Sequence, residues 1–141
     1  MDQEKIKLAL HTFSNNLPER PEWTILMKAS GEFIARIGEY PYFYPQAIED
    51  FTAAQWTHAH GIHLLNTLDH LNHGGLDFSV TFGGNRIFCL FHLNYAYFLG
   101  ITFNGLKSLD TMINAIQFHT IDILEAINPT HPTTPSQPAS S

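Results

Sequence analysis

The sequence is short of cysteine, of cationic residues and of long apolar runs. Its 141 residues include one cysteine, Cys89, which excludes an intrachain disulfide and a zinc site built from cysteines. The sequence has seven lysines and arginines but thirteen aspartates and glutamates, which gives a net charge of −6. This charge disfavours nucleic acid and anionic membranes as partners. No apolar run approaches the roughly 18 residues of a membrane span, and no secretory leader is recognisable. We therefore expect a cytoplasmic protein without membrane insertion.

The signatures of common enzyme classes are missing as well. The glycine pairs at 74–75 and 83–84 lack the Lys-Ser/Thr of a phosphate-binding loop and are typical of turns. There is no Gly-x-Ser-x-Gly elbow. Cys89 lies in an apolar segment, where a thiol is ordinarily inert core. We predict no catalytic residues, no enzymatic activity and no cofactor.

Nine histidines are present, and three of them fall within Thr57–His63. This segment resembles the His-x-His-x-Asp-His metal motif of metallo-β-lactamase-like hydrolases, but Ile62 stands where the carboxylate is required. The surrounding pattern is helical, and on a helix His63 and His70 project in nearly the same direction with His60 at their flank. Because no carboxylate completes the ligand set, we expect no metal site.

Three segments carry the periodicity of amphipathic helices, at residues 2–17, at about 46–72 and at about 106–127. Asn15, Asn16 and the following prolines end the first, and His73-Gly74-Gly75 ends the second. In the second helix, the apolar residues expected to form the buried side are Phe51, Ala54, Leu64, Leu65, Leu68 and Leu71.

Five segments are typical of strands. A hairpin is predicted over Glu22–Ile37, with its turn at Ser30-Gly31. Three strand candidates follow the second helix, at Leu76–Phe82, Arg86–Leu93 and Tyr95–Phe103. The first alternates apolar with polar residues and fits an edge strand with one buried face. The other two are apolar on both faces, which predicts central strands covered by helices on both sides.

The element order α-β-β-α-β-β-β-α predicts an α+β fold with meandering antiparallel strands and helices on both faces of the sheet. This domain occupies residues 1–128. From Pro129 to Pro138 a proline recurs every third residue among threonine, serine and glutamine. Such a composition buries too little surface to offset ordering, so we expect residues 129–141 to be a disordered Pro/Thr/Ser-rich tail.

The order and lengths of these elements resemble the Roadblock/LC7 family from about Ile6 to Ile127. The resemblance lies in the hairpin Glu22–Ile37, the long helix ending at His73-Gly74-Gly75, and three consecutive strands followed by a helix after Asn104-Gly105. Profilin-like and longin folds share much of this layout. The resemblance implies a five-stranded antiparallel sheet, with the middle helix on one face and the terminal helices on the other.

The resemblance also implies a function. Members of the family are non-catalytic regulators and scaffolds, and bacterial and archaeal members accompany and can stimulate a Ras-like small GTPase of the gliding-polarity type. It implies a homodimer in which the middle helices lie side by side and the third strand pairs with its mate, through Leu76, Phe78, Ser79, Val80 and Phe82. We expect a homodimeric GTPase regulator or binding partner. A structural scaffold subunit of a motility, pilus or transport complex and a profilin-like ligand-binding sensory module stay open as alternatives.

The predicted partner-binding surface is the solvent side of the middle helix, formed by Gln55, Ala59, His63, Asn66 and His70. Small and amide residues allow another protein to approach closely without burying a fixed charge. The helix has no lysine or arginine, so it cannot supply an arginine finger in trans. Stimulation of a GTPase would therefore have to reposition the GTPase's own residues.

Overall fold

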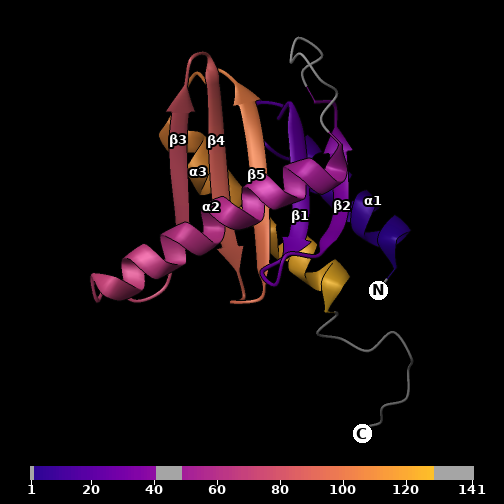
Figure 1. Ribbon diagram of the computed structural model, residues 1–141. Coiled ribbons are helices and arrows are strands. Elements are labelled where there is room, and N and C mark those ends of the chain that lie inside the picture. The colour runs from indigo at the N-terminus through magenta and orange to yellow at the C-terminus, as the bar shows by residue number, and fades with distance from the viewer. Residues whose placement is uncertain (1, 41–48, 129–141) are drawn as a thin grey trace, which may run out of the picture.

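The computed structural model describes residues 2–40 and 49–128, which form a five-stranded antiparallel sheet with helices on both faces (Figure 1). In chain order the elements are α1 (Gln3–Asn15), β1 (Trp23–Lys28), β2 (Phe33–Gly38), α2 (Asp50–His70), β3 (Phe78–Gly83), β4 (Arg86–Leu93), β5 (Tyr97–Asn104) and α3 (Leu109–Ile127). The strands lie side by side in the order β2-β1-β5-β4-β3. The predicted α+β fold and its element order are thus confirmed.

Local capping explains where the helices begin. Asp2 precedes α1, and its carboxylate accepts hydrogen bonds from the backbone N–H groups of Glu4 and Lys5. Helix α3 begins three residues later than predicted because Ser108 caps it, its Oγ accepting from the N–H of Thr111 at 3.3 Å. The predicted tail, and the predicted start of the second helix at Gln46, lie outside the described residues.

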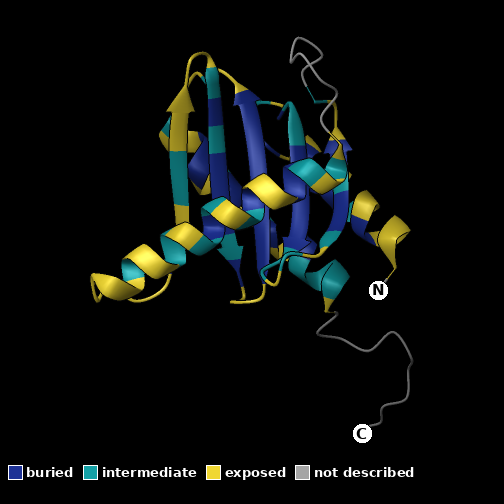
Figure 2. Cartoon of the chain, in the orientation of Figure 1, coloured by how far each residue is buried: buried dark blue, intermediate teal, exposed yellow. Residues whose placement is uncertain are grey.

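The sheet separates two hydrophobic cores. Helices α1 and α3 cover one face, where Phe13, Leu99 and Met112 are completely buried. Helix α2 covers the other face, over Met27 and Phe98. Strands β4 and β5 are central and largely buried on both faces, as predicted (Figure 2). The core position predicted for the single cysteine is confirmed, since it is fully buried on β4 and burial raises its pKa to about 11.

Helix α2 crosses its face of the sheet obliquely, and its C-terminal end projects beyond β3 (Figure 1). Its buried residues are small: Ala53, Ala54, Thr57 and Gly61. A Cβ at Gly61 would lie 2.5 Å from Cζ of Phe98, so only glycine permits this close approach. The predicted buried side was therefore partly wrong.

Two large residues account for the error. Phe51 and Leu71, expected on the buried side, are 68% and 60% exposed. Leu64, Leu65 and Leu68, by contrast, are half-buried and pack against the core, as expected. The side of α2 that carries the small residues lies nearest the sheet, because only small side chains fit in this close contact. Phe51 lies on another side of the helix and therefore points outward. Leu71 follows the last residue of α2, at the end that lies past the sheet edge (Figure 2).

Candidate functional site

The outward side of α2 carries the predicted partner-binding residues. Gln55, Ala59, His63, Asn66 and His70 are all exposed and are spaced along one side of the helix. Their polar contacts stay within α2: Nδ1 of His70 lies 2.8 Å from the carbonyl oxygen of Asn66. The backbone carbonyl of His63 accepts a 2.8 Å hydrogen bond from the hydroxyl of Thr67, one turn later. The structure thus brings the five residues together on a surface open to solvent, while their role in binding stays a prediction.

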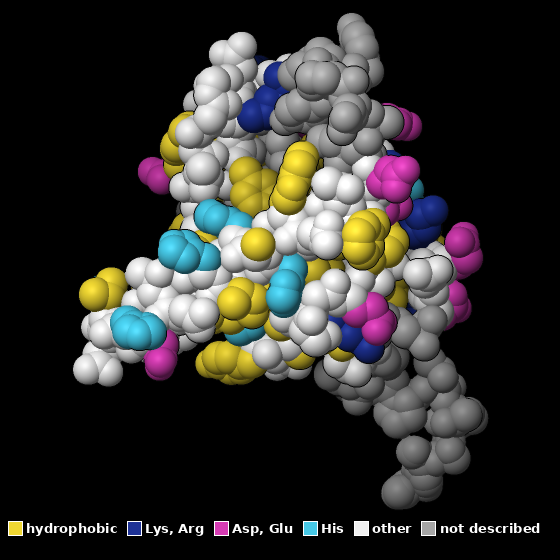
Figure 3. All heavy atoms as spheres, viewed as in Figure 1, with side chains coloured by type: hydrophobic (Ala, Val, Ile, Leu, Met, Phe, Trp, Pro, Cys, Tyr) yellow, Lys and Arg dark blue, Asp and Glu magenta, His cyan; other side chains and the backbone are white. Residues whose placement is uncertain are grey.

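Two aromatic side chains beside this polar stripe were expected from the sequence to extend beyond the sheet-facing side of the helix, but they were not assigned to the partner-binding surface. Phe51 and Trp56 lie in the first half of α2 and are 68% and 60% exposed. Asp50 and Asp69 are the only residues of α2 with a fixed charge, and neither is cationic. Histidine and hydrophobic side chains are consequently interspersed along the helix (Figure 3). Exposed aromatics within a surface of low charge are typical of protein interfaces.

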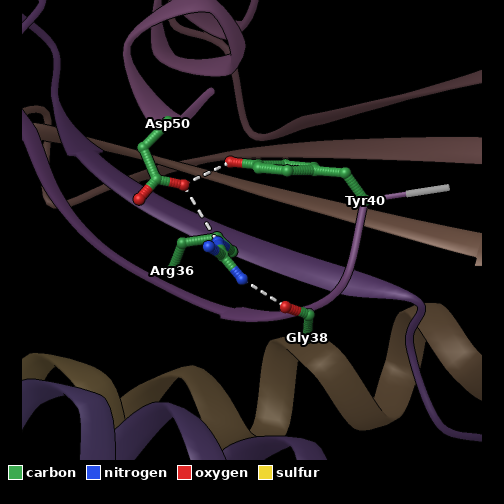
Figure 4. Close-up of polar contacts among 4 residues, drawn as sticks. All are labelled: Arg36, Gly38, Tyr40 and Asp50. Atoms are coloured by element: carbon green, nitrogen blue, oxygen red, sulfur yellow. Dashed lines mark hydrogen bonds and ion pairs between the residues drawn. The ribbon is translucent and has the colours of Figure 1, made fainter. Parts of the chain in front are cut away.

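The start of α2 is fixed to β2 by a cluster of polar side chains (Figure 4). Oδ1 of Asp50 accepts hydrogen bonds from Nε of Arg36 at 2.9 Å and from the hydroxyl of Tyr40 at 2.7 Å. Arg36 also donates to the carbonyl of Gly38, and its guanidinium lies 4.8 Å from the Tyr40 ring centroid. Burial together with the Asp50 carboxylate raises the pKa of Tyr40 far above its ordinary value. The first turn of α2 is therefore held in a defined position on the sheet.

The histidines of the Thr57–His63 segment do not converge. His60 turns toward the sheet, with its ring centroid 5.9 Å from that of Phe88, whereas His63 is exposed. Burial and the proximity of His63 lower the pKa of His60, which favours the neutral imidazole. Within residues 2–40 and 49–128, no cluster of three or more His, Cys, Asp or Glu side chains is arranged to hold a metal ion. In the same part of the chain, no helix combines the length and the apolar character that crossing a membrane requires.

Among the described residues, strand β3 forms one edge of the sheet and pairs only with β4. Phe78 and Phe82 are 38% and 65% exposed, so the predicted burial of one face is only partial within a single chain. Phe78 stacks on Phe91 of β4 with ring centroids 5.4 Å apart, which places it on the α1/α3 side of the sheet. Leu76 was predicted as the first residue of this strand, but it precedes β3 and is buried beneath α2. It is therefore not available to a partner.

The backbone of β3 presents alternate residues to the open edge. The N–H of His92 donates to the carbonyl of Asp77 at 3.1 Å, and these two residues are directly opposite each other. Because bonded and non-bonded pairs alternate in an antiparallel ladder, Ser79 bonds to β4, whereas the backbone groups of Phe78 and Val80 face outward. The same alternation leaves the backbone of Phe82 facing the edge. These outward groups are able to pair with another strand.

Comparison with known proteins finds likeness in structure alone. No protein-family model and no curated protein matches the sequence. Myxococcus xanthus MglB has a similar structure, with a TM-score of 0.75 and 13% sequence identity over 94% of this chain and 96% of that one. A structure described as MglB with tetrameric arrangement gives a TM-score of 0.64 at 13% identity, over 89% and 86% of the two chains. The Roadblock/LC7 domain from Streptomyces avermitilis gives 0.69 at 7% identity, over 85% and 95%.

These structures resemble this chain in fold, whereas their sequence identity to it is 13% or less. The similarity spans nearly all of this chain and of each similar structure, so it extends to the whole domain rather than to a common hairpin. The chain has the Roadblock/LC7 fold.

Proposed function

We propose that this protein is a non-catalytic, homodimeric regulator or binding partner of a Ras-like small GTPase. The observation that carries the proposal is the position of two exposed surfaces on the same domain. One is the cation-free outward side of α2, and the other is the unpaired edge of β3. Both are features that the Roadblock/LC7 resemblance associates with partner binding and with self-association.

The edge of β3 supports self-association. Phe78 and Phe82 are exposed there, and no element of the described chain pairs with the outward backbone groups. An uncovered apolar edge strand invites pairing with another chain, and natural proteins usually blunt or cover such edges. A second copy of β3 is self-complementary in an antiparallel arrangement, which satisfies the twofold symmetry of a homodimer. One similar structure is described as tetrameric, so this fold is compatible with assembly.

Val80 is the residue at which to test this dimer. Its backbone N–H faces the open edge, so Val80→Pro removes an intermolecular donor and leaves the pairing with β4 in place. Val80→Ala is the matched control because it loses similar side-chain packing and keeps the N–H. Light scattering coupled to gel filtration should give a dimer for the wild type and for Val80→Ala, and a monomer for Val80→Pro. A wild-type protein that is monomeric at micromolar concentration would refute the homodimer.

The face of α2 supports binding of a partner protein. It combines aromatic, amide and imidazole side chains with few fixed charges, whereas a helix side built for solubility alone usually carries lysine and glutamate. When a partner protein covers such a face, no charged side chain is left buried without a partner in the interface. Its fixed attachment through Asp50 keeps it rigid relative to the sheet.

Charge introduced on this face should weaken binding of the GTPase. The double variant Ala59→Arg/His63→Glu places opposite charges one turn apart on exposed positions. The control, Asn114→Arg/Gln117→Glu, makes the same change on exposed positions of α3, which covers the opposite sheet face. Titration calorimetry with small GTPases of the same organism should show binding at least tenfold weaker for the α2 variant alone. Full-strength binding by a correctly folded, dimeric α2 variant would contradict this surface assignment.

Dependence on the bound nucleotide separates a regulator from a scaffold. A regulator must distinguish the GDP state from the GTP-analogue state of its GTPase, because only differential affinity shifts an equilibrium between states. We expect the two affinities to differ by at least about fivefold, at the lower end of typical coupling. Equal affinities would favour a structural scaffold subunit instead.

A further inference from the structure

A cavity of about 280 Å³ lies between the first half of α2 and the sheet. Small residues, Ala53 and Thr57, form its helix side, and Thr102 of β5 and Phe88 of β4 lie on its sheet side. In Figure 1 these are the strands that α2 crosses. Protein cores leave few voids larger than a water molecule. This space is nearly twice the volume of about 150 Å³ that accommodates benzene in an engineered cavity, which suits a bicyclic ring.

The walls of the cavity are largely aromatic. The ring centroids of Trp23 and Phe88 lie 6.1 Å apart at an interplanar angle of 40°. On the other side of Phe88, the His60 ring meets it edge to face at 5.9 Å. Trp56, which is 60% exposed, lines the cavity from α2. Aromatic faces held at several angles favour a flat, conjugated ligand, which stacks on one ring and presents its edge to another.

The charges at the wall are already compensated. Arg86 donates from Nε and Nη2 to the two carboxylate oxygens of Glu22, at 2.9 and 2.6 Å. This bidentate pair joins β4 to the segment before β1 and leaves no net charge for an anionic or cationic ligand. Burial also favours the neutral form of His60. The cavity therefore suits an uncharged occupant.

Two polar atoms at the wall are buried without a hydrogen-bond partner. They are Nε2 of His60 and Oγ1 of Thr102, the latter on a residue that is only 5% exposed. A buried donor or acceptor without a partner is destabilising, so a polar group supplied by a ligand would be favourable at this wall. Both atoms are shielded from water in the present rotamers, so a hydrogen bond to a ligand requires that the side chain of His60 or Thr102 rotates.

We propose that this cavity binds an uncharged, planar, bicyclic heteroaromatic compound of the size of indole. Its ring stacks on the cavity-lining face of Phe88 or of Trp23, and its N–H or O–H group bonds to His60 or Thr102. This binding function is distinct from the contact with a GTPase, because the other cavity residues of α2 lie on its inner side and only Trp56 borders both surfaces. Either proposal can fail without the other.

Indole and indene are the probes, because they share nearly the same shape and only indole has an N–H group. Titration followed by ¹H–¹⁵N NMR on the full chain, at up to about 1 mM ligand, should perturb signals of Trp23, Trp56, His60 and Thr102. Indole should bind about tenfold more tightly than indene, as one good hydrogen bond implies. An absence of perturbation, or perturbation confined to another surface, would overturn the proposal. Tighter binding of N-acetyltryptophan amide than of indole would assign the cavity to a protein side chain instead.

Two kinds of variant test the assignment further. Ala53→Leu fills the cavity from α2, and a folded variant should lose binding of both probes. Thr102→Val and His60→Leu each remove one unpartnered polar atom, and at least one of them should abolish the preference for indole while indene still binds. Because Thr102→Val preserves side-chain volume, this comparison stands even where Ala53→Leu does not fold. A folded Ala53→Leu that binds indole like the wild type, or a preference for indole that survives both polar variants, would refute the proposed site.

Discussion

Replacing Gly61 by alanine should destabilise the protein, although the same change normally stabilises a helix. The new Cβ would lie 2.5, 2.7 and 2.8 Å from three ring carbons of Phe98, whereas carbon atoms in contact prefer about 3.5–4.0 Å. The helix or the ring must therefore move by about 1 Å. Phe98 is completely buried, and its ring centroid lies 5.2 Å from that of His92 and 6.4 Å from that of His58, which limits its retreat.

The magnitude follows from two opposing effects. Overpacking of a core costs about 1–3 kcal/mol, and the better helix propensity of alanine returns up to about 1 kcal/mol. When alanine returns the full 1 kcal/mol, the net loss in the free energy of unfolding for Gly61→Ala is about 0–2 kcal/mol. For a domain of this size the melting temperature should fall by up to about 8 °C. Urea and thermal unfolding followed by circular dichroism measure both quantities.

Two further variants isolate the clash. Ala59→Gly, on the exposed side of α2, calibrates the helix-propensity effect without changing the contact with the sheet. In a Phe98→Leu background the ring is gone, so Gly61→Ala should become neutral or stabilising. A Gly61→Ala variant that is more stable than the wild type would refute the close approach of α2 to β5.

Three more predictions concern polar groups that are buried or partly buried. Thr24→Val should stabilise the protein by about 1 kcal/mol in urea unfolding, because Oγ1 of Thr24 is buried without a hydrogen-bond partner and valine fills the same space; a loss of stability would indicate a bond that the hydroxyl makes. Asp50→Ala should cost about 1–2 kcal/mol, since Arg36 and Tyr40 then lose their shared acceptor; Tyr40→Phe should cost less. The protein should become less stable as the solution becomes more acidic. Burial lowers the pKa of His60 and of His92, although nearby backbone groups partly oppose the shift at His92. Below the ordinary histidine pKa of about 6.5, the unfolded chain therefore binds more protons than the folded one. The free energy of unfolding should therefore decrease as pH falls through about 6.5, and His92→Gln should flatten that decrease.

The sequence predicted the fold because each element carries its own local signal. Hydrophobic runs placed β4 and β5 at the centre, and glycine or asparagine marked each hairpin turn. Two residues with positive φ, Asn94 at 51° and Tyr95 at 56°, form the turn between β4 and β5, so β5 begins two residues after the predicted strand start at Tyr95. These signals act over a few residues, so they are readable without knowledge of the tertiary structure.

The side of α2 that faces the sheet was not readable in this way. Large apolar residues such as Phe51 dominate a hydrophobic pattern, whereas the observed contact depends on Gly61 and small neighbours. What makes glycine necessary is a phenylalanine on β5, far away in the sequence. A spacing of Ala53, Thr57 and Gly61 every four residues was the available signal, and its meaning depends on the partner surface. The cavity, with the unpartnered polar atoms of His60 and Thr102, could not be predicted from the sequence for the same reason.

The positions of the three arginines bear on the proposed contact with a GTPase. Arg36 is paired with Asp50 and holds the start of α2, and Arg86 is paired with Glu22 beside the cavity. Arg20 lies between α1 and β1 and donates to the side chain of Asn15 at 3.0 Å. None of the three is on α2, and two hold parts of the domain together through ion pairs. A GTPase docked on the outward side of α2 therefore meets no arginine finger from that helix. Acceleration of hydrolysis at this surface would depend on binding the GTPase in a conformation that places its own catalytic residues correctly.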